Sequence, residues 1–171
     1  MFCCFLRDSS PKGVKMLSYD IPGYGRLQIE NVVFDFNGTL VSDGRISAKV
    51  KDRLNLLAKK TNVVIVTSDT RGNVREIFKK IKVNIKIIEG EDSSKKKEAL
   101  IEELGSDKTV AVGNGRNDHL MLRKALFSIC VIDKEGSYSK SLMNADVIVK
   151  SPLDAIDFLL KPLRIIATLR D

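Results

Sequence analysis

Four stretches of the sequence carry side chains that can do chemistry, and three of them directly follow or end runs of β-forming residues. The first run ends at Asp35, the second ends at Thr67, and the third leads into the polar stretch Gly113–Asp118. The fourth stretch is the lysine run Lys95–Lys97. A carboxylate at the end of a strand is a potential nucleophile, a hydroxyl donates hydrogen bonds, and an ammonium group neutralises an anion. Each stretch alone is weak, but together they favour a catalytic Asp35 over a carboxylate that only caps a turn.

The hydrophobic periodicity predicts a scaffold that brings these stretches together. Runs typical of buried strands alternate with helical stretches, which predicts a doubly wound α/β fold with a parallel sheet. Right-handed crossovers place the carboxyl ends of such strands at one edge of the sheet, where Asp35, Thr67 and Asn114 are expected to meet. The expected strands are 31–35, 62–67, 83–88, 109–112, 127–132 and 146–149, and the expected helices are 47–60, 73–80, 94–104, 117–126, 139–144 and 153–160.

The two ends of the chain depart from this alternation. Residues 1–15 show no periodicity and are expected to be a disordered extension. Leu17–Ile21 and Arg26–Glu30 flank a glycine-rich turn, which predicts a β-hairpin directly before the first core strand. Near the other end, Pro162 interrupts the helical pattern. Residues 163–169 then form a basic, apolar tail to which the sequence assigns no structure.

The composition is that of an ordinary globular protein, with 171 residues of which 43% are hydrophobic and 30% charged. Residues 16–171 have the length of a single domain, and no apolar run is long enough to span a membrane. Cys3, Cys4 and Cys130 match neither a disulfide framework nor a zinc-binding pattern, which indicates the cytoplasm. The net charge of +7 is spread along helical stretches and mixed with acids, without an aromatic platform. No nucleic-acid partner and no membrane partner are therefore expected.

The order and spacing of the four stretches resemble the haloacid dehalogenase (HAD) superfamily of phosphoryl-transfer enzymes. Within it, three motifs look most like those of the phosphorylation domain of P-type ATPases: Asp35-Phe36-Asn37-Gly38-Thr39, Thr67-Ser68-Asp69 and Gly113-Asn114-Gly115-Arg116-Asn117-Asp118. Over residues 16–170 the chain is similar to the small soluble P-type ATPase-like phosphatases. This resemblance implies a magnesium-dependent phosphohydrolase, a phosphatase or a slow ATPase, that acts on a small phosphorylated substrate.

The resemblance also assigns roles to individual residues. Asp35 matches the nucleophile, which forms an aspartyl-phosphate that water later hydrolyses. Thr67 matches the hydroxyl that hydrogen-bonds a phosphoryl oxygen. The resemblance favours Lys97 over Lys95 and Lys96 as the catalytic ammonium. Consecutive helical residues point about 100° apart, so only one of the three lysines can face the site. The expected phosphate-binding residues are Gly38, Thr39, Thr67, Ser68 and Lys97.

The metal that the resemblance implies is a single Mg²⁺ ion, which prefers hard oxygen ligands and retains several waters. The implied ligands are the Asp35 carboxylate, the Asn37 main-chain carbonyl, and Asn114 or Asp118. Asn114 and Asp118 lie four residues apart across a turn into a helix, so both can converge on one site. The metal would neutralise phosphate charge and align the phosphoryl group with the nucleophile.

Three departures from the family pattern bear on activity. Many superfamily phosphatases carry a general acid two residues after the nucleophile, whereas Asn37 has no titratable proton. Asn114 stands where the family usually has Asp, which is expected to weaken magnesium binding. Ser68 replaces the glycine of the ATPase motif, and Asp69 either completes that motif or caps the next helix. Slow turnover is therefore expected, and the alternative is a catalytically weakened module that binds a phosphorylated ligand or a protein partner.

The intervals Thr39–Asn62 and Asp69–Lys95 leave room for little beyond one helix each. The superfamily usually inserts a cap domain in one of these two intervals, so the chain is expected to lack a cap and to have an open site. Capless relatives often form oligomers in which a neighbour covers the site. The hairpin at residues 17–30 is a candidate for that cover in a homo-oligomer.

Overall fold

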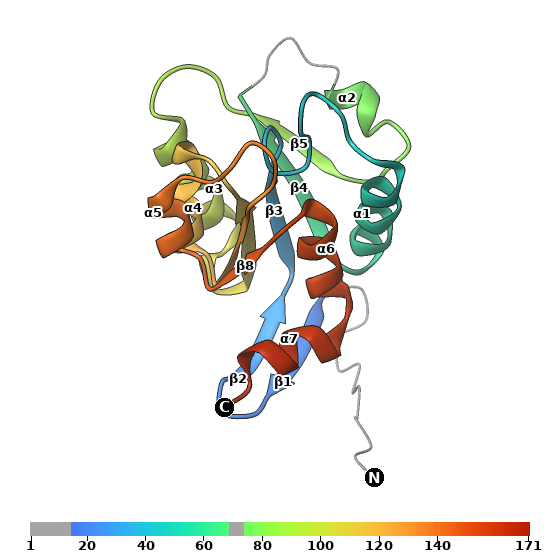
Figure 1. Ribbon diagram of the computed structural model, residues 1–171, viewed down its shortest axis with the longest axis vertical. Coiled ribbons are helices and arrows are strands. Elements are labelled where there is room, and N and C mark those ends of the chain that lie inside the picture. Colours follow the sequence, from blue (N-terminus) through green and yellow to red (C-terminus); the bar gives the residue numbers. More distant parts are fainter. Residues whose placement is uncertain (1–14, 69–73) are drawn as a thin grey trace.

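Six parallel strands form the central sheet in the order β5-β4-β3-β6-β7-β8 (Figure 1). The structure, a computed structural model, describes residues 15–68 and 74–171. From β3 the chain adds strands on one side, then crosses back and adds strands on the other side, so β3 and β6 flank a topological switch point. The strands are β3 (Asn31–Asp35), β4 (Asn62–Thr67), β5 (Asn84–Ile87), β6 (Thr109–Gly113), β7 (Phe127–Val131) and β8 (Val147–Val149).

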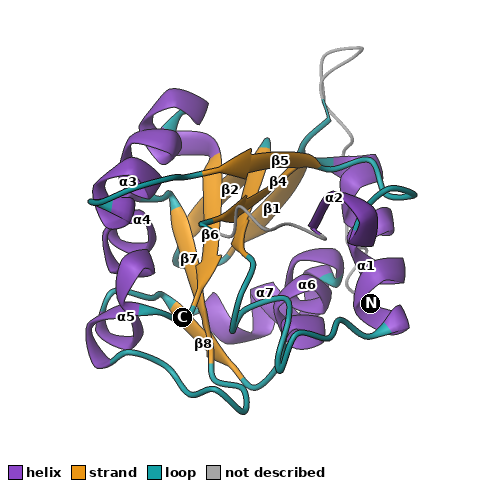
Figure 2. Ribbon diagram, turned by 90° about the horizontal axis from the view of Figure 1, so that it is seen from above, coloured by secondary structure: helices purple, strands orange, loops and turns teal. Residues whose placement is uncertain are grey.

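Helices cover both faces of this sheet (Figure 2). One face carries α1 (Ala48–Lys60), α2 (Val74–Ile77) and α6 (Pro152–Leu160), and the other carries α3 (Ser93–Leu104), α4 (His119–Lys124) and α5 (Ser139–Met143). Alternate residues of β3 enter the two cores: Phe34 packs with the α1 and α6 side, and Val33 packs with the α3 and α4 side. All five residues of β3 are buried, which explains its continuous run of β-formers. The α/β fold with a parallel sheet that the sequence predicts is confirmed.

A hairpin extends from the amino-terminal edge of the sheet, opposite the carboxyl ends of the strands (Figure 1). Its strands β1 (Leu17–Ile21) and β2 (Gly25–Ile29) pair antiparallel, as the sequence predicts. Helix α7 (Pro162–Leu169) packs beside the hairpin, and the Tyr19 hydroxyl donates a hydrogen bond to the Leu159 carbonyl. The hairpin is thus part of the hydrophobic core and lies far from the edge where the site residues are expected.

Helix α1 illustrates how local sequence sets the scaffold. The Ser47 hydroxyl accepts a hydrogen bond from the Val50 N–H and caps the first turn. The side chains that face the sheet lie three, four or one positions apart along one stripe, and they are Val50, Leu54, Leu57 and Ala58. The helix therefore begins and ends where the sequence predicts.

Helix α2 is shorter than the sequence predicts. The expected helix covers residues 73–80, but the structure has α-helix only from Val74 to Ile77, and residue 73 lies outside the described ranges. The reason is the buried ring of Phe78, which packs edge-on against Phe36 with ring centroids 6.0 Å apart. The Ile81 N–H then bonds to the Phe78 carbonyl, and this turn redirects the chain toward β5.

The segment after Pro162 and the segment before Leu126 also differ from expectation. Residues 163–169 are helical, because Pro162 occupies the first turn of α7, where its missing N–H costs nothing.

The expected helix 117–126 begins instead as a short 3₁₀ turn at Arg116–Asp118 and continues as α4. It ends early because the Leu126 N–H bonds to the carbonyl of Thr109 at the start of β6.

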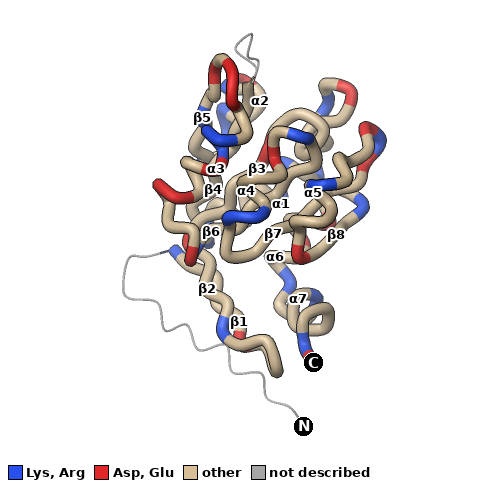
Figure 3. The backbone as a smooth tube through the Cα atoms, turned by 90° about the vertical axis from the view of Figure 1, so that its left-hand side faces the viewer, with Lys and Arg blue, Asp and Glu red and all other residues tan. Residues whose placement is uncertain are grey.

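Charged residues occur along most elements of the backbone, with lysine and arginine interspersed among aspartate and glutamate (Figure 3). Several form exposed ion pairs, such as Arg26 with Asp20 and Lys124 with Glu102. Among the described residues, none of the helices has the length and apolar character needed to cross a bilayer.

Candidate active site

Lys97 lies at the centre of a buried charge cluster. Its Nζ donates to Asp35 Oδ1 at 2.6 Å and to Asp118 Oδ1 at 2.7 Å, and the lysine side chain is fully buried. Asp35 ends β3, Lys97 comes from α3, and Asp118 lies in the turn that follows β6. A lysine is almost never buried unless it is paired, and here one ammonium bridges two carboxylates. The cluster carries one excess negative charge when all three groups are ionised.

The structure separates Lys97 from its two neighbours in the lysine run. Lys95 is exposed beside Asp92, and Lys96 donates to the Glu89 carbonyl at 2.6 Å. Lys97 lies on the same face of α3 as the buried residues Leu100 and Ile101, three and four positions later. The helical register therefore turns only Lys97 of the three toward the end of β3.

Asp118 is held from two directions. Its Oδ1 accepts the Lys97 hydrogen bond, and its Oδ2 accepts from the main-chain N–H groups of Asn114 at 3.0 Å and Gly115 at 2.8 Å. A side chain on Gly113 would meet Asp118, since an added Cβ would lie 2.7 Å from the aspartate Cγ. The glycine therefore lets the carboxylate fold back against β6, where it positions Lys97.

Burial and charge shift the pKa values of this cluster in opposite ways. Burial, together with the nearby Asp118 carboxylate, raises the pKa of Asp35 to about 7, although Lys97 acts to lower it. Burial also acts to lower the pKa of Lys97, but the two carboxylates outweigh it and hold that pKa above its ordinary value. The lysine therefore stays charged, while the Asp35 carboxyl ionises near neutral pH.

The loop after Asp35 is a tight turn fixed by its own main chain. The N–H groups of Leu40 and Val41 both donate to the Phe36 carbonyl at 3.0 Å, and the Gly38 N–H donates to the Val41 carbonyl at 2.8 Å. Gly38 has a φ of +75°, which favours glycine. Of the residues expected to bind phosphate, Gly38 thus uses its N–H within the loop. The exposed Asn37 lies beside Asp35 at the tip of this turn.

The second predicted motif lies one strand away. Thr67 is buried at the end of β4, and its carbonyl accepts from the Ile88 N–H at 2.8 Å. In the sheet register Val66 pairs with Asp35, so Thr67 lies one residue past the position of Asp35. Ser68 follows it and is exposed. Asp69, the candidate third residue of the motif, lies outside the described residues.

Asn114 connects three loops at the carboxyl edge of the sheet. Its Oδ1 accepts from the Thr39 hydroxyl at 2.9 Å, and its Nδ2 donates to the Gly136 carbonyl at 3.1 Å. Its main-chain carbonyl accepts from the Tyr138 N–H at 2.9 Å. The amide uses both a donor and an acceptor here, which a carboxylate cannot do. Thr39, expected to bind phosphate, donates its hydroxyl proton to this amide instead.

The loop between β7 and α5 is the part of the site that sequence reasoning missed. Asp133 accepts from the Ser42 hydroxyl at 2.8 Å, and Glu135 accepts from the Asp43 N–H at 3.1 Å. The signal is present in the sequence, because these acids follow the predicted buried strand 127–132 in the same way that Asn114 follows the predicted strand 109–112.

Residues with oxygen atoms suited to a divalent cation lie at the carboxyl ends of β3 and β6. The oxygen atoms are the Asp35 carboxylate oxygens, the main-chain carbonyl oxygen of the exposed Asn37, and the Asn114 amide oxygen, which keeps a second lone pair beside the one that Thr39 uses. In residues 15–68 and 74–171, no three His, Cys, Asp or Glu side chains converge as a metal cage. One carboxylate with neutral oxygens and retained waters nevertheless fits Mg²⁺. Both carboxylate oxygens of Asp118 already accept hydrogen bonds from protein donors. These contacts suit a residue that holds Lys97 in place better than one that binds a metal.

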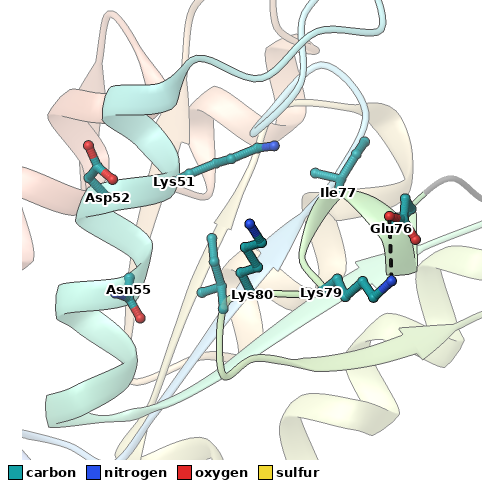
Figure 4. Close-up of a pocket in the computed structure, with 8 residues that line it drawn as sticks. Lys51, Asp52, Asn55, Glu76, Ile77, Lys79 and Lys80 are labelled. Carbon is teal, nitrogen blue, oxygen red and sulfur yellow. Dashed lines mark ion pairs between the residues drawn. The ribbon is translucent and has the colours of Figure 1, made fainter.

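A separate surface pocket lies between α1 and the segment around α2 (Figure 4). It encloses about 440 Å³, and Lys51 and Lys80 extend into it from the two sides. Asp52, Glu76 and Lys79 also line it, with Lys79 paired to Glu76 at 3.9 Å. None of the predicted site residues lines this pocket, so it is distinct from the cluster around Lys97.

Solved structures share this fold at low sequence identity. The 3-deoxy-D-manno-octulosonate 8-phosphate phosphatase of Moraxella catarrhalis, solved with magnesium, phosphate and KDO, aligns with a TM-score of 0.65 and 20% identity over 83% of this chain and 94% of that chain. The cobalt-bound deoxy-D-mannose-octulosonate 8-phosphate phosphatase (YrbI) of Haemophilus influenzae aligns with a TM-score of 0.65 and 13% identity, over 84% of this chain and 94% of that chain. A putative HAD family hydrolase of Streptomyces avermitilis aligns with a TM-score of 0.62 and 19% identity, over 80% of this chain and 86% of that chain.

The chain therefore has the fold of the haloacid dehalogenase superfamily, as its motifs predict. No protein-family profile matches it. The uncharacterized protein MJ0073 of Methanocaldococcus jannaschii is 46% identical over 74 residues, which make up 43% of this chain and 80% of that protein. The uncharacterized protein MJ0072 of the same archaeon is 38% identical over 39 residues, or 23% of this chain and 89% of that protein. By identity and coverage the chain belongs to the family of MJ0073.

Proposed function

We propose that the chain is a magnesium-dependent phosphohydrolase that forms an aspartyl-phosphate on Asp35. The observation that carries this proposal is the buried contact of 2.6 Å between Lys97 and Asp35 at the carboxyl edge of the sheet. A fixed ammonium beside a carboxylate neutralises the charge that gathers when a phosphoryl group approaches the nucleophile. The shared fold with phosphatases, one of them solved with magnesium and phosphate, supports the same proposal.

The reaction has two displacement steps. In the first, an Asp35 carboxylate oxygen attacks phosphorus, and the bond from phosphorus to the leaving-group oxygen breaks, with its electron pair going to the leaving group. In the second, a water oxygen attacks phosphorus, the bond to Asp35 breaks, and the water proton passes to solvent. Inorganic phosphate leaves, and the Asp35 carboxylate is restored. Lys97 stays charged through both steps, and the Thr67 hydroxyl at the end of β4 is assigned to a phosphoryl oxygen.

Asp35, Asn37 and Asn114 would hold the magnesium ion, and Asp118 is assigned to holding Lys97. When bound, the metal supplies positive charge that stabilises the transferring phosphoryl group. The ionised form of Asp35 is needed both for this binding and for attack, and its pKa of about 7 makes that form available from neutral pH upward.

Asn37 limits the substrates that turn over quickly. An exposed amide at this position can bind a leaving group by hydrogen bonds but cannot protonate it. Small phosphorylated molecules whose leaving group departs as a stable anion are therefore the expected substrates, such as acyl phosphates, aryl phosphates and nucleoside triphosphates. A closer likeness to soluble P-type ATPase-like phosphatases remains a prediction from the motifs.

Hydrolysis of acetyl phosphate and para-nitrophenyl phosphate tests the proposal, with and without Mg²⁺. We expect metal-dependent turnover by the wild type and none by Asp35→Asn. Asp107→Asn is the matched control, because Asp107 is an exposed aspartate in the turn before β6, at the opposite edge of the sheet and outside the hairpin. Beryllofluoride binding by the wild type, lost in Asp35→Asn, would support the phosphoryl site independently.

Failure of both measurements would overturn the hydrolase and favour the binding module. The specific observation behind that second candidate is the pair of amides, Asn37 and Asn114, at positions where the family pattern carries acids. The module would bind a phosphorylated ligand or protein partner at the same loops without turning it over.

A homo-oligomer is a further part of the proposal. The hairpin formed by β1 and β2 lies at the edge of the sheet opposite Asp35, so it cannot cover the site of its own chain (Figure 1). It can reach only the site of a neighbouring copy. Light scattering tests this, and a monomer at all concentrations would reject the cover.

A further inference from the structure

The loop between β7 and α5 is fastened to the loop that follows the nucleophile. Asp133 accepts from the Ser42 hydroxyl, and Glu135 Oε1 accepts from the Asp43 N–H. Asp133 uses its other oxygen for the Lys134 N–H at 2.8 Å. Glu135 is therefore the carboxylate of this loop whose second oxygen, Oε2, has no hydrogen-bond partner among the described residues. It is exposed but held in place through Oε1.

The unused oxygen of Glu135 lies beside the predicted metal ligands. A Cβ added to Gly38 would lie 3.1 Å from Glu135 Oε2, and the same point lies 2.6 Å from Asn114 Nδ2 and 3.0 Å from Asn114 Oδ1. The carboxylate and the amide thus approach the same side of Gly38. Gly38 itself lies one residue after Asn37 and three after Asp35, so Glu135 Oε2 lies close to the loop that carries the predicted ligand Asn37.

The charge balance of the site gives this carboxylate a role. Lys97 cancels one of the two buried carboxylates, and Asn114 contributes an uncharged oxygen. A divalent cation at Asp35 would therefore meet less negative charge than hard cations usually do in proteins. Glu135 is an acid whose free oxygen the contacts above place close to Asn114, and among the described residues no ion pair with a lysine or arginine competes for it.

We propose that Glu135 is an outer carboxylate of the magnesium site, which supplies from the β7–α5 loop the negative charge that Asn114 lacks. It is a positioning residue that acts through the field at the metal or through a metal-bound water. This inference rests on the proposed function, because it requires a metal at Asp35. Carboxylates outside the direct ligand shell typically change metal affinity by about ten- to a hundredfold.

Calorimetric titration of the full chain with MgCl₂, without substrate, tests the inference. Glu135→Gln keeps an oxygen that accepts from the Asp43 N–H but removes the charge, whereas Glu135→Ala removes both. We expect both variants to bind Mg²⁺ about ten- to a hundredfold more weakly than the wild type. Glu91→Gln, an exposed glutamate on the loop after β5, is the control of equal charge and should bind as the wild type does.

Wild-type affinity in Glu135→Gln would overturn the inference. So would a loss seen only in Glu135→Ala, since that would show a tether for the loop and no electrostatic role. Asp35→Asn in the same titration separates this inference from the proposed function. If Asp35→Asn also binds Mg²⁺ unchanged, the magnesium site at Asp35 is wrong. If Asp35→Asn loses binding while Glu135→Gln does not, only the role of Glu135 fails.

Discussion

Lys97 Nζ lies 2.6 Å from Asp35 Oδ1, which joins the end of β3 to a helix residue 62 positions later in the chain. The contact is buried, so water and salt screen it little. It helps to explain why a charged lysine lies inside the protein, because Asp35 and Asp118 both compensate its charge, and removing the lysine would leave two buried carboxylates without a partner. The same contact places the ammonium where a phosphoryl group on Asp35 would be.

Replacing Lys97 with Met tests the stabilising role of this contact. The variant keeps most of the side-chain volume but leaves Asp35 and Asp118 as adjacent buried carboxylates. We expect a loss of about 3–5 kcal/mol in the free energy of unfolding at pH 8, measured by urea denaturation. The loss should shrink at pH 5, since the Asp35 carboxyl, whose pKa is raised, then holds its proton. Lys95→Met, an exposed neighbour on the same helix, should change the free energy by no more than about 0.5 kcal/mol.

The raised pKa of Asp35 predicts how stability depends on pH in metal-free protein. The folded chain holds the Asp35 proton up to a pKa of about 7, whereas the unfolded chain releases it near the ordinary value of 3.8. Between these two values the folded state binds more protons than the unfolded state, so this group makes the free energy of unfolding fall as the pH rises. The fall begins near pH 4 and levels off above pH 7.

Other groups also titrate in this range, so the measurement is a difference. We expect the free energy of unfolding of the wild type minus that of Asp35→Asn to decrease between pH 4.5 and 7.5. A difference that rises over this interval would mean that Lys97 lowers the pKa of Asp35 more than burial and Asp118 raise it. Saturating Mg²⁺ should oppose the decrease, since the metal favours the ionised carboxylate.

The fold was predictable from the sequence because its signals are local. Continuous β-forming runs mark strands that are buried on both faces, and the stripe through Val50, Leu54 and Leu57 marks α1. Helix α7 is not predicted, because a proline such as Pro162 is compatible both with the end of one helix and with the first turn of another. The end of α2 was missed because the contact between Phe78 and Phe36 is tertiary, and no local pattern records it.

The candidate site likewise has residues whose positions follow from local sequence and residues whose roles depend on tertiary contacts. Asp35, Thr67 and Asn114 follow strands in sequence, so parallel pairing alone brings them to one edge. Which of the three lysines faces Asp35 depends on the register of α3. The roles of Asn114 and Glu135 depend on contacts between loops that are far apart in the chain. A residue such as Asn114 looks like a lost carboxylate in the sequence, whereas the structure shows an amide that uses both its donor and its acceptor.

Restoring the family's carboxylate at position 114 should therefore destabilise metal-free protein. In Asn114→Asp the donor to the Gly136 carbonyl becomes an acceptor, so two acceptors face one another. We expect a loss of about 1–3 kcal/mol in the free energy of unfolding in the presence of a chelator. With Mg²⁺ the loss should become smaller, because the new carboxylate is a stronger metal ligand. Equal stability with a chelator would show that the loop around Gly136 rearranges freely.

Asn37 offers a gain-of-function test of the leaving-group argument. Asn37→Asp places a titratable carboxyl two residues after the nucleophile, and the exposed position has room for it. For a substrate with a poor leaving group, such as glycerol phosphate, we expect kcat to rise by about a hundredfold, because the new acid can protonate the departing oxygen. For acetyl phosphate, whose leaving group is already a stable anion, kcat should change little.

Asn55→Asp is the control, because it adds the same charge on α1, where Asn55 lines the separate pocket, and it should change neither kcat value. An equal rise for both substrates would indicate that the added charge acts on metal binding, and the ratio of the two kcat values decides between these explanations.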